Sequence, residues 1–256
     1  MPQGFFKNIP NILYDFKSDG QLSTAKDLFR KVSTWTYLQE GITGYSYYRI
    51  VDGERADVTA SRLYGDSTLY WTFFLVNDNL QDFNDWPMGS HHFERFIDRK
   101  YSGTCLVSSA STDIVSLTSK FTLGEKVSQS SSIYGFVTEI NPTHNRITLN
   151  DVTGTFTAGG TATGTTSEKS FTISSVTAER DAVNHYTDSN GYKVTVSEFI
   201  APTTGTGAMI YSSSNNTLVT NLEHERNLNE DKHLIRYIEP AFIGRVVDEF
   251  MELMRG

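Results

Sequence analysis

The chain has 256 residues, of which 38% are hydrophobic and 12% aromatic, a composition that suits one large or two modest folded domains and excludes global disorder. Its formal net charge of −8 repels phosphate backbones, which excludes a general nucleic-acid-binding protein. Cys105 is the only cysteine, so the chain has no intrachain disulfide and no multi-cysteine metal site.

The sequence carries no sign of a targeting or membrane-spanning segment. Residues 1–7 lack the charged region and continuous apolar stretch of a signal peptide. Residues 69–76 form the longest dense apolar run, which is far too short to span a bilayer. We therefore expect a protein that is made in the cytoplasm and does not insert into a membrane.

The first hundred residues are rich in aromatic side chains and predict short helices with one strand. A strand is expected where aromatic residues cluster, and helices where caps precede apolar periodicity. In chain order the expected elements are a helix opened by the capping box at residues 24–27, a strand at 45–50, a helix at Ala56–Tyr64 ended by Gly65, a second helix capped by Ser67 and a third helix near Ser90.

Residues 103–216 differ in texture, because they are rich in Ser, Thr and Gly and lack helical periodicity. Short β-type segments recur there, separated by turn residues, at 113–117, 134–140, 146–149, 171–176 and 192–199. The motif Phe-Thr-x-Gly occurs at residues 121–124 and again at 156–159, as an internal repeat. Two copies predict a small β-barrel or sandwich.

The last forty residues return to a charged, helical texture. Residues 232–238 predict a strand, and Pro240 suits the first turn of a helix over about residues 240–254. Apolar side chains recur in that helix at three- and four-residue spacing, which gives an amphipathic stripe. A helix of this length is marginal alone, so the stripe must pack either on the chain's own N-terminal part or on a neighbouring subunit, and we favour the neighbour.

Three motifs resemble catalytic or ligand sites, and each lacks a required group. His91 and His92 are adjacent in a helix and do not converge on one metal ion. The glycine-rich stretch at 159–164 lacks the lysine of a phosphate loop, and residues 188–191 lack the later ligands of a calcium loop and suit a hairpin turn. We predict no catalytic residue, cofactor or metal, and hence no enzyme, although carboxylate pairs cannot be located by spacing.

Residues 48–77 resemble a LysM module, with Tyr48, the Tyr-Gly-Asp sequence at 64–66 and Asn77 at the expected places within about 45–88. The resemblance implies a strand, two helices and a closing strand, and glycan binding. These residues also suit the core and turns of a small fold that is retained as an interaction module, and we favour this second interpretation.

Two blocks of the chain resemble, in order, the baseplate wedge protein of T-even-like contractile-tailed phages, the gene product 53 type. The residues that carry the resemblance are 27–30, 47–48, 63–65, 69–71, 77–79 and 86–88, followed by 229–240 and 250–254. The resemblance implies a structural subunit of the virion tail baseplate that links neighbouring wedges or inner-baseplate proteins. The compact members of the family have no counterpart of the β-rich middle.

We therefore expect an α+β fold with a LysM-like module at 1–102, an inserted β-barrel or sandwich at 103–216, and a C-terminal strand plus amphipathic helix at 217–256. Expected partners are other wedge and inner-baseplate proteins and neighbouring copies, with no nucleic acid. Two alternatives stay open: a peptidoglycan-binding tail adaptor or lysin, and a sugar-binding fibre component that uses the insert. The candidate interface residues are Tyr47, Tyr48, Tyr64, Tyr70, Trp71, Trp86, Ile243, Val246, Phe250 and Met254.

Overall fold

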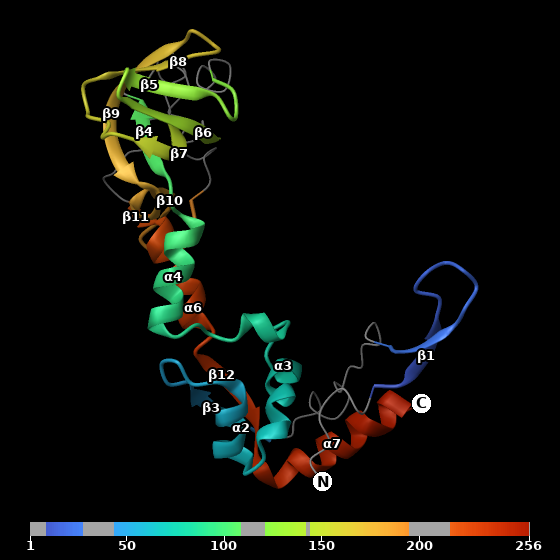
Figure 1. Ribbon diagram of the computed structural model, residues 1–256. Coiled ribbons are helices and arrows are strands. Elements are labelled where there is room, and N and C mark those ends of the chain that lie inside the picture. Colours follow the sequence, from blue (N-terminus) through green and yellow to red (C-terminus); the bar gives the residue numbers. More distant parts are fainter. Residues whose placement is uncertain (1–8, 28–43, 109–120, 142–143, 195–215, 256) are drawn as a thin grey trace. The chain divides into compact units, whose positions relative to one another are not determined.

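The computed structural model describes residues 9–27, 44–108, 121–141, 144–194 and 216–255 (Figure 1). The chain divides into two compact units. The first, which we call the split unit, contains residues 1–91 and 228–256; the second, the barrel unit, contains residues 92–227. Each unit is described by itself. Among the described helices, none is long and apolar enough to cross a membrane.

The split unit begins with a β-hairpin instead of the helix predicted from the capping box. β1 (Asn11–Tyr14) pairs antiparallel with β2 (Ser23–Lys26), and Leu13 lies opposite Thr24. The Asp15 carboxylate accepts backbone N–H bonds from the hairpin loop, the shortest from Gly20 at 2.8 Å, so it closes the loop and favours strand pairing over a helical start. The remainder of the predicted helix lies outside the described residues.

The next elements follow the prediction closely. β3 (Tyr45–Arg49) leads into α2 (Ala56–Tyr64), which ends at Gly65 with a left-handed φ of 74°. The second helix begins as a 3-10 turn, η2 (Ser67–Trp71), and continues as α3 (Thr72–Val76). Its cap is Asp66, whose carboxylate accepts the Thr68 N–H, and not the predicted Ser67.

The remaining elements of the split unit include the partner of β3, which comes from the far end of the chain. In order they are η3 (Phe83–Asp85), the start of α4 (Ser90–Lys100), the end of α6 (Asn221–Asp231), β12 (Leu234–Ile238) and α7 (Pro240–Arg255). β12 runs antiparallel to β3, with Ile235 opposite Tyr48 (Figure 1). α6 was not predicted, whereas β12 and α7 were.

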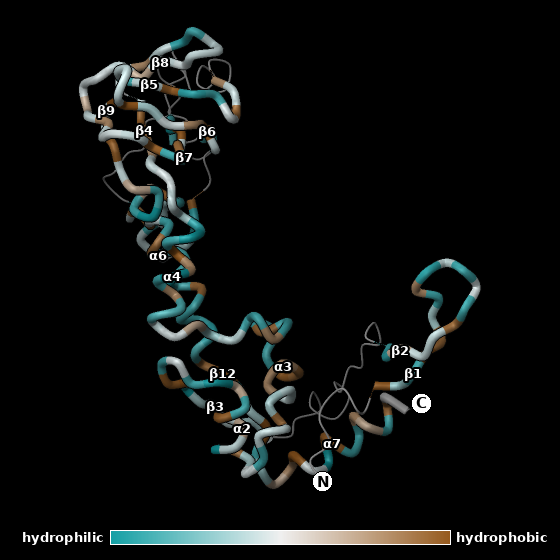
Figure 2. The backbone as a smooth tube through the Cα atoms, in the orientation of Figure 1, coloured by the Kyte–Doolittle hydropathy of each residue, from teal (hydrophilic) through white to brown (hydrophobic). Residues whose placement is uncertain are grey.

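The split unit has a central core between the β3–β12 ribbon and the helices. Phe73 and Ile235 are fully buried in it, together with Ile50, Ala60 and Leu80. A second apolar contact holds α7, because the Phe250 ring packs on the buried Trp71 at 4.4 Å between centroids. The stripe of α7 therefore packs on the chain's own N-terminal part, the alternative that we did not favour from sequence. Hydrophobic and polar stretches alternate along α7 in Figure 2.

The barrel unit is built around a closed six-stranded antiparallel barrel in the order β4-β7-β6-β5-β8-β9. Its strands are β4 (Thr104–Ser108), β5 (Lys126–Ser130), β6 (Ile133–Asn141), β7 (Arg146–Thr153), β8 (Thr161–Gly164) and β9 (Ser170–Ala178). Apolar side chains from alternate positions fill the interior. They include Leu106, Val127, Val137, Ile147, Leu149, Ala162 and Ile173. The predicted strand at 113–117 lies outside the described residues.

The sequence repeat corresponds to two equivalent turns of the barrel. Phe121 and Phe156 are both buried, and Gly124 and Gly159 both adopt a left-handed φ, of 78° and 83°. The Gly124 N–H donates to the Val137 carbonyl at 2.7 Å, and the Gly159 N–H donates to the Ile173 carbonyl at 2.8 Å. The second copy thus repeats the backbone hydrogen bonding of the first, which explains why the motif recurs.

Glu125 and Gln129, which follow the first copy of the motif, form hydrogen bonds to residues in and after the second copy. The buried Glu125 carboxylate accepts hydrogen bonds from the backbone N–H and the hydroxyl of Ser167, both at 2.7 Å, and from the Thr122 N–H at 3.0 Å. Gln129 bonds the Thr157 side chain at 2.7 Å and occupies the space that a side chain at Gly160 would need. A side chain at Gly160 would therefore displace the Gln129 amide from its bond to Thr157.

The chain's entry into the barrel and its return from it are joined through one residue. The Glu179 N–H donates to the Gly103 carbonyl at 2.8 Å, and the Asn221 amide donates to the Glu179 carbonyl at 2.7 Å. The segment from Glu179 to Asn221 contains η4 (Glu179–Asp181) and a two-stranded ribbon of β10 (Val183–Thr187) and β11 (Thr217–Thr220). Residues 103 and 221 therefore lie near each other, as an inserted unit requires.

We expect Phe250→Ala to lower the free energy of unfolding of the split unit by about 3–5 kcal/mol, because a buried ring is replaced by a cavity. Urea denaturation followed by tryptophan fluorescence measures this loss, since all three tryptophans, at positions 35, 71 and 86, precede the barrel. Leu253→Ala is the control, because Leu253 lies on the same helix and is 42% exposed. Equal stability of the two variants would contradict the packing of α7.

We expect the barrel's stability to depend on the charge of Glu125. Burial by itself raises the pKa of this carboxyl, but the donors led by Ser167 outweigh it and hold the pKa below its ordinary value of 4.5. Because the folded pKa is lowered, the stabilisation is complete above the unfolded pKa and is lost as the pH falls through the folded pKa.

Glu125→Gln should therefore cost about 1–3 kcal/mol at pH 7, because its NH₂ group faces N–H donors, and the difference from the parent chain should shrink as the pH falls below 4.5. Differential scanning calorimetry of the full chain measures both effects. Glu168→Gln, at an exposed turn, is the control. A pH-independent difference would contradict the assignment.

Candidate functional site

The predicted interface residues of the N-terminal block divide between surface and core. Tyr47 is 68% exposed, whereas Trp71 is 2% exposed and lies under α7. Tyr48 is half-buried, and its hydroxyl donates to Glu54 at 2.9 Å and accepts from Arg62. Tyr64 is mostly buried, and burial raises its pKa to about 12. Of these four side chains, Tyr47 is the one that is free to meet a partner.

The predicted interface residues of α7 lie mainly in the chain's own core. Val246 and Phe250 are buried, and Ile243 is half-buried against the same cluster as Val246. The side chain of Met254 lies outside the described residues. An interface role for this stripe stays a prediction, and it requires α7 to leave the position that it has here.

Two buried asparagines join the N-terminal and C-terminal segments of the split unit. Asn77, which is 5% exposed, donates to the Phe73 and Arg236 carbonyls and accepts the Arg236 N–H, each at 2.8 Å. Asn229 accepts the Met88 N–H at 2.8 Å and donates to the Met88 carbonyl at 2.9 Å. Each amide therefore pairs with one residue's N–H and C=O on the opposite segment, as a neighbouring strand would. The sequence analysis placed both asparagines in segments that carry the family resemblance, but it assigned a contact to neither.

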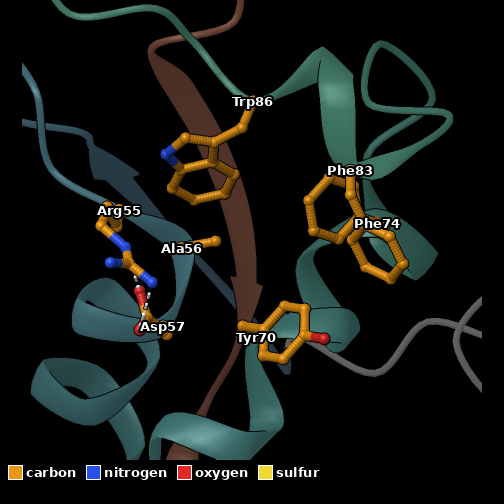
Figure 3. A pocket seen from close by; sticks show the side chains of 7 residues that line it. All are labelled: Arg55, Ala56, Asp57, Tyr70, Phe74, Phe83 and Trp86. Atoms are coloured by element: carbon orange, nitrogen blue, oxygen red, sulfur yellow. Dashed lines mark hydrogen bonds and ion pairs between the residues drawn. The ribbon is translucent and has the colours of Figure 1, made fainter. Parts of the chain in front are cut away.

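A pocket of about 420 Å³ opens on the split unit between the start of α2 and the segment that follows η2. Figure 3 shows aromatic rings around it, with Ala56 directed toward its centre. Its lining residues are Arg55, Ala56, Asp57, Tyr70, Phe74, Phe83 and Trp86. Of these, Tyr70 and Trp86 were predicted as interface residues, and the pocket brings them together; Phe74 and Phe83 were not predicted.

The aromatic walls of the pocket are held in place by one another and by the backbone. The Phe83 ring lies 4.9 Å from Phe74 and 5.5 Å from Tyr70, measured between centroids. The Trp86 indole N–H donates to the Glu54 carbonyl at 2.8 Å, which fixes the indole at the mouth. The pocket is therefore preformed, because its rings have packing and hydrogen-bond partners without a ligand.

One exposed ion pair lies at the edge of this apolar surface. Arg55 and Asp57 form two hydrogen bonds of 3.1 Å, drawn as dashed lines in Figure 3. The combination of apolar walls and one ion pair suits an apolar or aromatic side chain that is flanked by charge. Within the part of the chain that the structure describes, no group of three His, Cys, Asp or Glu side chains is placed to hold a metal ion.

The comparison with known families gives a match for the N-terminal part of the chain. Residues 5–102 match a family of structural proteins of the phage baseplate. The family is described as base plate wedge protein 53, and the match confirms, over this range, the resemblance predicted from sequence. No curated protein matches the chain. The C-terminal block at 229–254 lies outside the matched range, yet it supplies β12 to the fold of the matched segment.

The predicted LysM-like module at about 45–88 stays a prediction. β3, α2 and the η2–α3 helix follow the expected order of a strand and two helices. The strand that pairs with β3 is β12, from residues 234–238, and not a segment before residue 88. Residues 77–88 instead carry η3, whose capping box includes Asp82 and Asp85.

We expect Asn77→Ala to lower the free energy of unfolding of the split unit by about 3 kcal/mol, because the substitution leaves buried backbone groups at Phe73 and Arg236 unpaired. Tryptophan fluorescence during urea denaturation measures the change. Asn79→Ala is the matched control, since Asn79 makes one exposed 3.0 Å bond to the Asp231 carbonyl and should change stability by less than about 0.5 kcal/mol. Similar losses in both variants would count against the role given to Asn77.

Proposed function

We propose that the chain is a structural subunit of a contractile phage tail baseplate wedge, which links neighbouring wedges or inner-baseplate proteins through protein–protein contacts and has no catalytic activity. The observation that carries the proposal is the match of residues 5–102 to the base plate wedge family. The subunit assembles in the host cytoplasm, becomes part of the virion tail, and has other wedge proteins, inner-baseplate proteins and neighbouring copies as partners.

The construction of the split unit supports this proposal. A subunit that links others must present fixed surfaces, and here β12 and α7 of the C-terminal segment each pack in an apolar cluster with residues of the N-terminal segment. Rigid elements hold interface residues in place better than loops do, which lowers the entropic cost of binding. Tyr47 on β3 and the pocket beside α2 are surfaces of this kind.

The barrel unit is proposed as an insertion that the family module tolerates, with domains at 1–102, 103–216 and 217–256. Residues 103 and 221 are linked through Glu179, so a short connection can replace the barrel. A chain in which a short Gly/Ser linker joins Tyr101 to Asn221 should keep the cooperative urea transition of the parent. By contrast, the fragment 1–102 alone should not, because β3 then lacks β12. Tryptophan fluorescence distinguishes the two outcomes, and a folded 1–102 fragment would sink the two-segment account.

The proposed function is tested by incorporation into particles. Complementation of a phage that lacks this gene should restore baseplates that contain the tagged chain, as detected by immunoblot of purified particles. Asn77→Ala should reduce incorporation because it destabilises the split unit, whereas Asn79→Ala should not. A chain that is absent from purified tails, with tail assembly intact, would overturn the proposal.

The alternative of a peptidoglycan-binding tail adaptor or lysin has one supporting observation, the aromatic lining of the pocket, because aromatic rings stack on sugar faces. Isothermal titration of the purified chain with N-acetylglucosamine oligomers tests it. The fibre alternative depends on aromatic residues exposed on the barrel unit, where Tyr192 is 74% and Phe136 38% exposed. Sugar binding that is lost when the pocket rings are substituted would favour the adaptor or lysin. Sugar binding that is lost when Tyr192 or Phe136 is substituted would favour the fibre component.

A further inference from the structure

The β1–β2 hairpin exposes a concentration of large apolar side chains. Leu13, Tyr14, Phe16 and Leu22 are 66%, 53%, 65% and 62% exposed. Figure 2 shows hydrophobic stretches of this hairpin on both sides of a hydrophilic loop. Single exposed apolar residues are ordinary, but four of them within ten residues mark an interaction surface.

The hairpin is built to present these side chains in a fixed arrangement. The Tyr14 and Phe16 rings contact each other edge to face, with centroids 5.1 Å apart. Asp15 between them takes the N–H groups of Lys17, Asp19 and Gly20, which fixes the loop. Leu13 and Tyr14 are consecutive strand residues, so their side chains lie on opposite faces of the hairpin. The aromatic face therefore includes Tyr14 and Phe16 and excludes Leu13.

The base of the hairpin is anchored, whereas its aromatic face is not. Ile9 is buried with Trp71 and Phe250, the Lys26 ammonium donates to the Ile9 carbonyl at 2.7 Å, and the Asp27 N–H donates to the Pro10 carbonyl. A two-stranded hairpin is marginally stable in water on its own. A partner that covers Tyr14 and Phe16 would therefore stabilise the hairpin as well as bind it.

The aromatic pocket of the same unit offers a site of matching chemistry. None of its seven lining residues belongs to the hairpin, and Phe16 is exposed, so one chain does not fill its own pocket. A pocket of about 420 Å³ has room for a phenylalanine ring, and its walls favour edge-to-face contacts. Lys17 and Asp19 are exposed and follow Phe16 in the hairpin loop, and Arg55 and Asp57 lie at the pocket edge, so each surface carries one positive and one negative charge that can pair with the other surface.

We propose that the hairpin of one copy docks in the aromatic pocket of a second copy, with Phe16 as the anchor. This deepens the proposed function, on which it rests, by naming the partner of these two surfaces. The contact is heterologous, because the hairpin and the pocket are different surfaces of one chain. Such a contact repeats from copy to copy and either closes into a ring or continues as a chain, which is the geometry that subunits around a tail axis require.

The test uses one variant for each surface, with a matched control for each. Phe16→Ser removes the anchor, and Leu13→Ser is its control on the opposite face at equal exposure. Ala56→Trp fills the pocket from the first residue of α2, and Val58→Ser is its control, because Val58 is 47% exposed on the same helix and does not line the pocket. Urea denaturation confirms that each variant is folded.

Sedimentation velocity of the purified chains, up to roughly 100 μM, is expected to show concentration-dependent association of the parent and of both controls. Phe16→Ser and Ala56→Trp should each weaken association at least tenfold. An equimolar mixture of these two variants should form dimers that do not grow further, because one intact hairpin meets one intact pocket.

A parent chain that stays monomeric throughout this range, or a variant mixture that does not associate, overturns the inference. If Phe16→Ser is excluded from baseplates while the parent does not self-associate, the hairpin binds a different baseplate protein and the inference is wrong. If the parent chain enters particles but does not self-associate, this inference is wrong and the proposed function stands. Parent chain that is absent from particles sinks the proposed function instead.

Discussion

The pairing of β3 with β12 is the constraint on which the rest of the split unit depends. A single strand buries little by itself, and the partner of β3 lies far along the chain, since Tyr48 is paired with Ile235. The ordering of so long a connection is costly in entropy, and a barrel that folds within the connection reduces that cost. Asn77 and Asn229 add polar links between the two segments, because Asn77 bonds the N–H and C=O of Arg236 and Asn229 those of Met88.

The barrel unit pairs its strands mainly through contacts that are closer in the sequence, so the entropic cost of its strand pairing is lower. Its strands β5 and β6 are joined by a short turn, as are β8 and β9, and the two copies of the repeat meet through the β5–β8 pair. Closure removes free strand edges, which would otherwise pair with other chains. Glu125 and Gln129 add polar bonds between the copies, so the barrel closes through specific contacts as well as apolar burial.

The aromatic residues of the split unit serve two purposes that their spacing does not distinguish. Trp71 and Phe73 are buried and hold α7 and the central core, while Tyr47 and Phe83 are exposed. Trp86 does both, because its N–H bonds the Glu54 carbonyl while its ring lines the pocket. A protein that works through contacts needs this combination, since buried rings hold the exposed ones in place.

The sequence by itself determined much of the local structure and the family resemblance of residues 5–102. Gly65 ends α2 because only a residue without a Cβ adopts its φ of 74° at little cost, and the repeated Phe-Thr-x-Gly motif predicted a small β-barrel or sandwich. Only the tertiary structure decided where the stripe of α7 packs and which strand completes β3. The reason is physical: an apolar stripe must be buried, but its pattern does not say against what. The capping box predicted a helix start at residue 24, whereas residues 23–26 form a strand that pairs with β1, and a pairing of this kind depends on residues outside the motif.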